Sequence, residues 1–73
     1  MTKTPTKTEL TARAALRLRV WGRRSGYMTA DMAWDAIAEV QGPITSPPAL
    51  SAQAVIRTAQ RELAANGEWI PVR

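Results

Sequence analysis

The sequence predicts a mainly α-helical domain of three helices with a short, incomplete β element at its end. Two observations lead to this prediction. Apolar residues recur at helical spacing in three segments, each preceded by a threonine or serine that can accept a hydrogen bond from the first turn. The last six residues, EWIPVR, combine aromatic and β-branched side chains, which favours a strand, and Pro71 restricts that strand to a sheet edge.

The first eight residues, MTKTPTKT, show no apolar periodicity. We therefore predict a disordered basic arm over residues 1–8 and a tri-helical domain over residues 9–73. Lys3 and Lys7 of the arm could touch phosphates or a minor groove. A solubilising tail is the more common role of such a terminus.

The first expected helix runs from Glu9 to about Arg24, with Thr8 as its N-cap. Two apolar lines follow the helix, the first made of Leu10, Ala14, Leu18 and Trp21 and the second of Leu16 and Val20. Arginines lie between and beside these lines, and their stems can cover apolar surface while their charges stay in water. We expect Gly22 to fray the last turn.

The segment Gly26-Tyr27-Met28 is expected to be extended and could form a small β-bridge with a later segment. The second helix is predicted over Ala30–Val40, with Thr29 as its N-cap. Its inward stripe is Ala33, Ala36, Ile37 and Val40. Trp34 lies outside that stripe, so it is either covered by the proline-rich loop that follows or exposed as an anchor for a protein partner.

An acidic ridge follows another side of the second helix, because carboxylates recur there every four residues, at Asp31, Asp35 and Glu39. The common role of such a ridge is a solvated face, with ion pairs to Arg13, Arg17 or Arg24 as a variant. It could instead face a basic protein surface. A metal site would need more oxygen ligands than one helix offers.

The third helix is predicted over residues 51–66 after a loop, QGPITSPPAL, that its prolines interrupt. Ser51 is the expected N-cap, Gly67 the left-handed residue that ends the helix, and Leu50 a hydrophobic staple. The apolar stripe is Ala52, Val55, Ile56, Ala59 and Leu63, and Trp21 and Trp69 are expected to complete the core. A different face carries Gln53, Arg57, Gln60 and Arg61.

Composition narrows the possible functions. The net charge is +4, and residues 9–26 carry +4 of it while residues 27–50 carry −3, so an anionic partner is favoured. The chain has neither Cys nor His, which removes disulfides, thiolate zinc sites and serine–histidine catalysis. With no phosphate-binding glycine loop either, we predict no enzyme, catalytic residue, cofactor or metal. We expect no membrane span and a cytoplasmic location in a bacterial or phage-infected cell.

The order of elements resembles winged helix-turn-helix DNA-binding domains, among them small phage and bacterial regulators and excisionases. The resemblance is strongest in TADMAWDAI and SAQAVIRTAQRELAANGEW. It implies that Ser51 starts a recognition helix whose Gln53, Arg57 and Arg61 face the major groove, and that Gly67 begins the turn into the wing. The connection before Ser51 is longer than the usual turn, and only the first strand of a wing is present.

The predicted function is therefore binding of double-stranded DNA, in transcription regulation or as a recombination accessory factor, with a homodimer left open. The expected DNA-binding residues are Gln53, Arg57, Gln60, Arg61, Arg23, Arg24, Lys3 and Lys7. A polar outer face is also common on ordinary surface helices. The alternative function is a protein-interaction module, such as a phage-type inhibitor of a host protein, that binds through Trp34, Asp31, Asp35 and Glu39.

Overall fold

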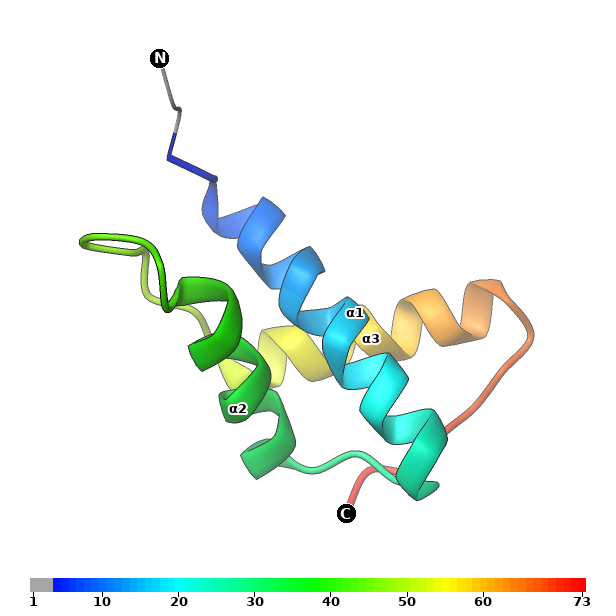
Figure 1. The fold of residues 1–73 in the computed structure, drawn as a ribbon. Helices are drawn as coiled ribbons and strands as arrows, with labels where there is room; N and C mark the ends of the chain where they lie inside the picture. The colour runs from blue at the N-terminus through cyan, green and yellow to red at the C-terminus, as the bar shows by residue number, and fades with distance from the viewer. Residues whose placement is uncertain (1–3) are drawn as a thin grey trace.

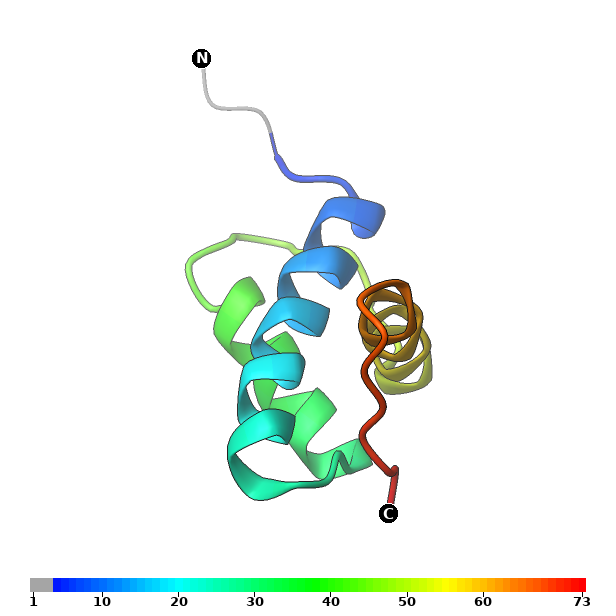
Figure 2. The same ribbon diagram turned by 90° about the vertical axis from the view of Figure 1, so that its right-hand side faces the viewer.

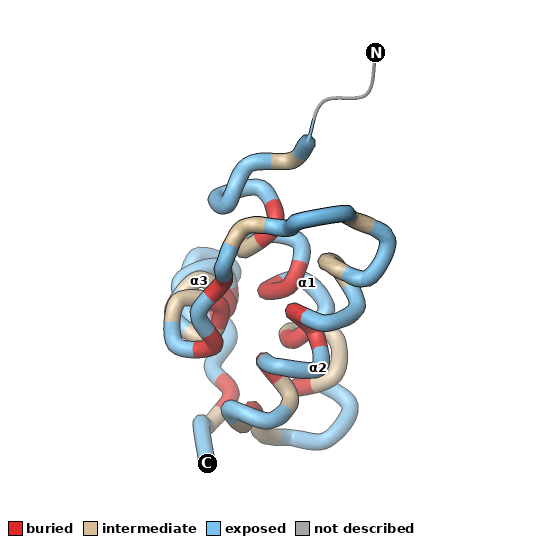
Figure 3. The backbone as a smooth tube through the Cα atoms, turned by 90° about the vertical axis from the view of Figure 1, so that its left-hand side faces the viewer, coloured by how far each residue is buried: buried red, intermediate tan, exposed pale blue. Residues whose placement is uncertain are grey.

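The computed structural model describes residues 4–73 and shows three helices: α1 (Lys7–Ser25), α2 (Ala30–Gln41) and α3 (Ala52–Ala65). The helices surround one interior, and the buried segments of all three face it (Figure 3). The mainly α-helical class predicted from the sequence is confirmed. Among residues 4–73, no helix combines the length and hydropathy that crossing a bilayer requires.

Side-chain caps begin each helix. Thr29 accepts from the Met32 N–H at 3.1 Å and Ser51 from the Ala54 N–H at 3.3 Å, so the predicted starts of α2 and α3 are confirmed. The start predicted for α1 is wrong by two residues. Thr6 caps this helix by accepting from the Glu9 N–H at 3.1 Å, which places Lys7 and Thr8 in the first turn rather than in an arm.

The end of α3 shows why Gly67 is needed. Its φ is +71°, a left-handed value that side chains disfavour. The Gly67 N–H donates to the Ala64 carbonyl at 3.0 Å, and the Glu68 N–H donates to the Leu63 carbonyl at 2.8 Å. These two bonds form a Schellman motif, which satisfies carbonyls left free at the helix end. The chain then turns back towards the end of α1 (Figure 1).

The C-terminal segment, residues 68–73, runs beside α1 to the connection between α1 and α2 (Figures 1 and 2). It forms one isolated parallel β-bridge, Met28 with Val72, which confirms the predicted pairing of the Gly26-Tyr27-Met28 piece. The larger strand expected from EWIPVR does not form among the described residues. One bridge is the whole β element of residues 4–73.

The core holds the predicted apolar stripes with two corrections. Trp69 is not in the core, because it is 79% exposed, and the neighbouring Ile70 is buried instead. An extended chain points successive side chains to opposite sides, so only one of these two neighbours can face inward. Gly22 does not fray α1: it is buried in a helix that continues to Ser25. Trp21, Val40 and Ile56 are only partly buried against the core.

The C-terminal segment and the connection between α1 and α2 both approach α1 closely at Gly22. A Cβ added at Gly22 would lie 2.8 Å from Met28 Cγ and 3.4 Å from Ile70 Cδ1. We expect Gly22→Leu to destabilise the fold. Overpacking costs about 1–3 kcal/mol, whereas the higher helix propensity of leucine stabilises the helix by less than about 1 kcal/mol. Urea denaturation measures the change. Ala12→Leu, at an exposed position of α1, is the control and should be nearly neutral; equal effects would contradict the close packing at Gly22.

Candidate nucleic-acid interface

The third helix is held in place by one side and open to solvent on the other. Its buried side chains are Ala52, Val55, Ala59 and Leu63. All four polar residues predicted for DNA contact on this helix are exposed: Gln53, Arg57, Gln60 and Arg61. Because successive residues turn by about 100°, these four span about a quarter to a third of the helix circumference. The structure therefore brings them together on one outward face, called here the Gln/Arg face.

The Gln/Arg face carries two positive charges that are not neutralised within the described chain. Among residues 4–73 the ion pairs are Arg17 with Glu39 and Arg23 with Glu68, and neither includes Arg57 or Arg61. The one acidic residue of α3 is Glu62, which the helical period places about 180° from Gln53. A positive, polar helix face of this kind can attract phosphates and donate to base edges.

A cleft of about 210 Å³ lies between the end of α3 and the C-terminal segment, and Gln60 of the Gln/Arg face lines it. Its lining comes from the end of α3 and from the segment that follows: Gln60, Leu63, Ala64, Glu68, Trp69 and Ile70. The exposed Trp69 therefore stands beside Gln60, at the edge of the Gln/Arg face. Sequence reasoning missed this because it placed Trp69 in the core; the alternation of side chains in an extended segment indicates that Trp69 and Ile70 cannot both face inward, but not which of them does.

Arg23 forms an intramolecular ion pair with Glu68. Its Nε donates to Glu68 Oε1 at 3.0 Å and its Nη2 to Glu68 Oε2 at 2.7 Å. A bidentate contact of this kind fixes the relative orientation of the two side chains and is stronger than a single hydrogen bond. Both side chains are 41% exposed, so the pair ties the end of α1 to the C-terminal segment at the surface. Arg23 was predicted as a DNA contact, and in this arrangement its guanidinium is occupied by Glu68.

The Arg23 guanidinium holds the pKa of the Glu68 carboxyl below its ordinary value of 4.5, chiefly through hydrogen bonds. Partial burial opposes this effect, and the charges of Arg23 and Arg19 add to it. The Glu68 carboxylate in turn raises the pKa of Arg23. A carboxyl whose pKa is lowered by folding stabilises the fold above its unfolded pKa, and that stabilisation is lost as the pH falls through the folded pKa.

We therefore expect the wild-type chain to melt at a higher temperature than Glu68→Gln at a pH of about 6, and the difference to shrink as the pH falls below 4.5. Thermal denaturation followed by circular dichroism across that range measures both. Arg23→Gln, which removes the other partner, should show the same narrowing. A difference that stays constant down to a pH of about 3 would show that the pair does not couple protonation to folding.

The remaining predicted contacts lie on α1 or outside the described residues. Lys7 is the first residue of α1 and Arg24 is in its last turn, and both are exposed. At about 1.5 Å per residue, their backbones are about 25 Å apart. Lys3 lies outside the described residues, 4–73. The structure thus gathers four of the predicted residues on α3 and leaves Lys7 and Arg24 at opposite ends of another helix.

The residues predicted for a protein partner lie on α2. Trp34 is 53% exposed, so the loop does not bury it, and Asp31 and Asp35 are exposed as well. Glu39 accepts from Arg17 Nη1 at 3.2 Å, which confirms one of the predicted pairs between the acidic ridge and α1. Within the described chain, no three acidic, Cys or His side chains are placed to hold a metal ion.

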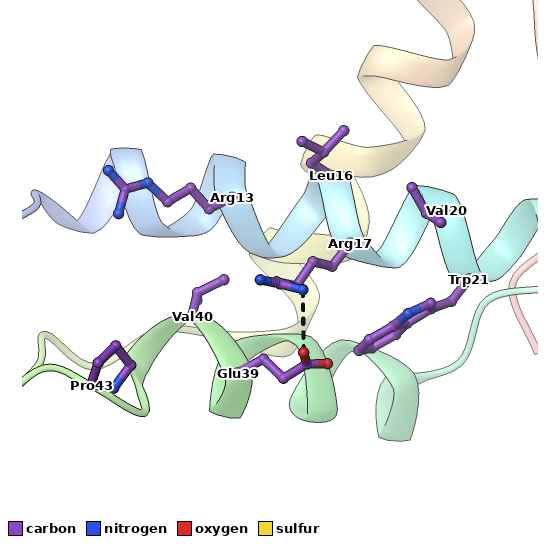
Figure 4. A pocket seen from close by; sticks show the side chains of 8 residues that line it. All are labelled: Arg13, Leu16, Arg17, Val20, Trp21, Glu39, Val40 and Pro43. Carbon is purple, nitrogen blue, oxygen red and sulfur yellow. Dashed lines mark hydrogen bonds and ion pairs between the residues drawn. The ribbon is translucent and has the colours of Figure 1, made fainter.

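A groove of about 540 Å³ lies between α1 and α2, and the Arg17–Glu39 pair crosses it (Figure 4). Trp21 points from α1 towards α2 in this view, and Val40 points back towards α1. Leu16, which is 51% exposed, extends the apolar surface along α1. Arg13 and Arg17 line this groove and are therefore not part of the Gln/Arg face.

Comparisons of the chain with protein-family models, with curated proteins and with solved structures find no significant match.

Proposed function

We propose that the chain is a DNA-binding protein of the winged-helix type that reads duplex DNA with α3, as a transcriptional regulator or a recombination accessory factor. The observation that carries this proposal is the Gln/Arg face, which is exposed and holds two arginines outside the ion pairs of the described chain. Arginine can donate two hydrogen bonds to guanine, and glutamine can pair with adenine in the same way. The apolar side of α3 fixes the helix, so these side chains project from a rigid support.

The order of elements supports the winged-helix assignment. Three helices are followed by an extended segment that bonds to the connection between the first two. Two features depart from that type: ten residues, 42–51, join α2 to α3, and the C-terminal segment makes one bridge rather than a hairpin. The proposal therefore rests on α3 and includes no second contact from a complete wing.

Contacts to the DNA backbone are assigned to Lys7 and Arg24, which are exposed at the two ends of α1. Lys3 belongs to the same proposed set. Arg23 is already paired with Glu68, so its charge is partly neutralised and only its remaining guanidinium donors are left for a phosphate. We infer that Arg23 stabilises the fold and that α3 supplies the contacts to bases.

The experiment that tests the proposal is fluorescence anisotropy with a labelled random-sequence duplex across a series of salt concentrations. Binding through phosphates releases counterions, so we expect affinity to fall steeply as salt rises. Selection from a pool of random duplexes then shows whether a preferred site exists. A chain that does not bind at low salt, or whose affinity is independent of salt, contradicts the proposal.

A second candidate function is a protein-interaction module. It is favoured by Trp34, which is 53% exposed on a helix whose Asp31 and Asp35 are exposed beside it. The internal pairing of Arg17 and Arg23 also fits it better than DNA binding. If this function is correct, Trp34→Ala and Asp35→Asn should abolish binding to a captured partner and leave duplex binding unchanged. The reverse pattern would support the DNA proposal.

A further inference from the structure

The C-terminal segment is fixed along its inner edge. The Met28 N–H donates to the Pro71 carbonyl at 2.8 Å, and the Arg73 N–H donates to the Met28 carbonyl at 2.8 Å. The Arg73 guanidinium lies over the Tyr27 ring, 4.8 Å from its centroid. With Arg23 holding Glu68, the segment is attached at both ends. Its side chains nevertheless leave much apolar surface in solvent, since Trp69 is 79% and Val72 43% exposed.

The outer edge of the same segment has no partner in the described chain. In an extended chain the N–H and C=O groups of successive residues point to opposite sides. The Pro71 C=O and the Arg73 N–H are both bonded to Met28. The N–H and C=O groups of Ile70 and Val72 therefore point away from Met28. Among residues 4–73, no hydrogen bond uses the N–H or C=O of either residue. Pro71, which lacks an N–H, stands at an inward position, so the outer edge keeps both of its donors.

We propose that this edge pairs with the same edge of a second copy of the chain, as an antiparallel two-stranded ladder about a twofold axis beside Pro71. Ile70 of each copy lies opposite Val72 of the other, and the two residues exchange N–H to C=O bonds, four in all. An edge with two unpaired donors and two unpaired acceptors is a template for such pairing. A twofold axis requires a surface that complements itself, as this edge does.

The side chains favour a second copy in the antiparallel direction. In this register Trp69 lies opposite Arg73 of the second copy. The Arg73 guanidinium is planar, so it can keep one face on Tyr27 and stack its other face on that indole. Glu68, which is paired with Arg23, stands at one end of the segment and Arg73 at the other, so antiparallel pairing places Arg73 next to Glu68 of the second copy, whereas parallel pairing places the two Arg73 charges together. Because the ladder is short, the dimer is expected to be weak and to depend on concentration. None of this rests on the DNA-binding proposal.

The first test is sedimentation equilibrium of the full chain over a range of concentrations, with Val72→Pro and Val72→Ala as a matched pair. Val72→Pro removes the outward N–H and leaves the inward Pro71 carbonyl and Arg73 N–H in place. We expect it to weaken dimerisation roughly tenfold or more, because two of the four bonds are lost. Val72→Ala keeps the N–H and should dimerise nearly as the wild type does. A Val72→Pro dimer as stable as the wild type overturns the proposal, and so does a wild-type chain that is monomeric at roughly 1 mM.

A second test fixes the register. The chain has no cysteine, so Pro71→Cys introduces a single thiol. In the proposed register the two copies of this residue form a non-hydrogen-bonded pair with Cα atoms about 4.5 Å apart, within reach of a disulfide. We expect Pro71→Cys to oxidise to a covalent dimer much faster than the control Ala38→Cys, which is exposed on α2. Equal rates overturn the register, and circular dichroism confirms that both variants are folded.

Discussion

Leu18→Ala is expected to unfold most or all of the chain at room temperature. Leu18 is completely buried in α1. Truncating a buried leucine removes transfer free energy and leaves a cavity, which together cost about 2–5 kcal/mol. A single core in a domain of this size rarely supplies more than about 3–5 kcal/mol of stability. Circular dichroism and urea denaturation should therefore show a chain with little or no cooperative transition.

The matched control is Leu16→Ala, the same substitution two residues earlier on the same helix. Leu16 is 51% exposed, so its side chain has less to lose, and we expect a cost of at most about 1 kcal/mol. If both variants lost the same free energy of unfolding, the burial pattern of α1 would be incorrect. Loss of stability in Leu16→Ala alone would place the core on the other apolar line of the helix.

The second large effect is expected for Arg57→Ala combined with Arg61→Ala. Under the DNA-binding proposal each arginine contributes about 1–3 kcal/mol of binding free energy. Its loss should weaken binding by roughly 5- to 150-fold per substitution. Where the contacts are to phosphates, the slope of log K against log salt should also fall by about one for each arginine. Both residues are exposed, so the fold should be unaffected. Anisotropy titrations at several salt concentrations measure the affinity and the slope together.

Arg13→Ala combined with Arg17→Ala is the control for net charge. It removes two positive charges from the groove between α1 and α2 rather than from the Gln/Arg face. A general electrostatic attraction would weaken equally in the two double variants. Contacts that the α3 arginines make with DNA are lost only in the Arg57→Ala, Arg61→Ala variant. Equal loss of affinity would therefore contradict the assignment of the Gln/Arg face, even if the chain binds DNA.

Local sequence signals predicted α2 and α3 well. Thr29, Ser51 and Gly67 mark helix ends because their effect is confined to hydrogen bonds and backbone angles within one turn. The start of α1 was misplaced although its signal is also local. Thr6 and Glu9 have the spacing of a capping box, whereas Thr8, which lies nearer to the apolar run, is followed three residues later by Thr11 rather than by Glu or Gln.

The residues that were placed wrongly are those that depend on contacts between distant segments. Gly22 is a weak helix former by itself, and it is buried because Met28 and Ile70 pack against it. Trp69 is the larger apolar side chain of its segment, but the bridge at Met28 fixes which neighbours face inward, and Ile70 takes the buried position. The partner of Arg23 could not be read from the sequence, because Glu68 is 45 residues away.

The sequence by itself determined the three helices, their caps and the polar face of α3, since periodicity and capping act over a few residues. Only the tertiary structure decided the charge distribution and the role of the C-terminal segment. Arg23 and Arg17 are paired, while the α3 arginines stay outside the ion pairs of the described chain, because packing brings Glu68 and Glu39 to α1 and no carboxylate to Arg57 or Arg61. The same packing bonds the inner edge of residues 68–73 to Met28 and leaves the N–H and C=O groups of Ile70 and Val72 without a partner in the described chain.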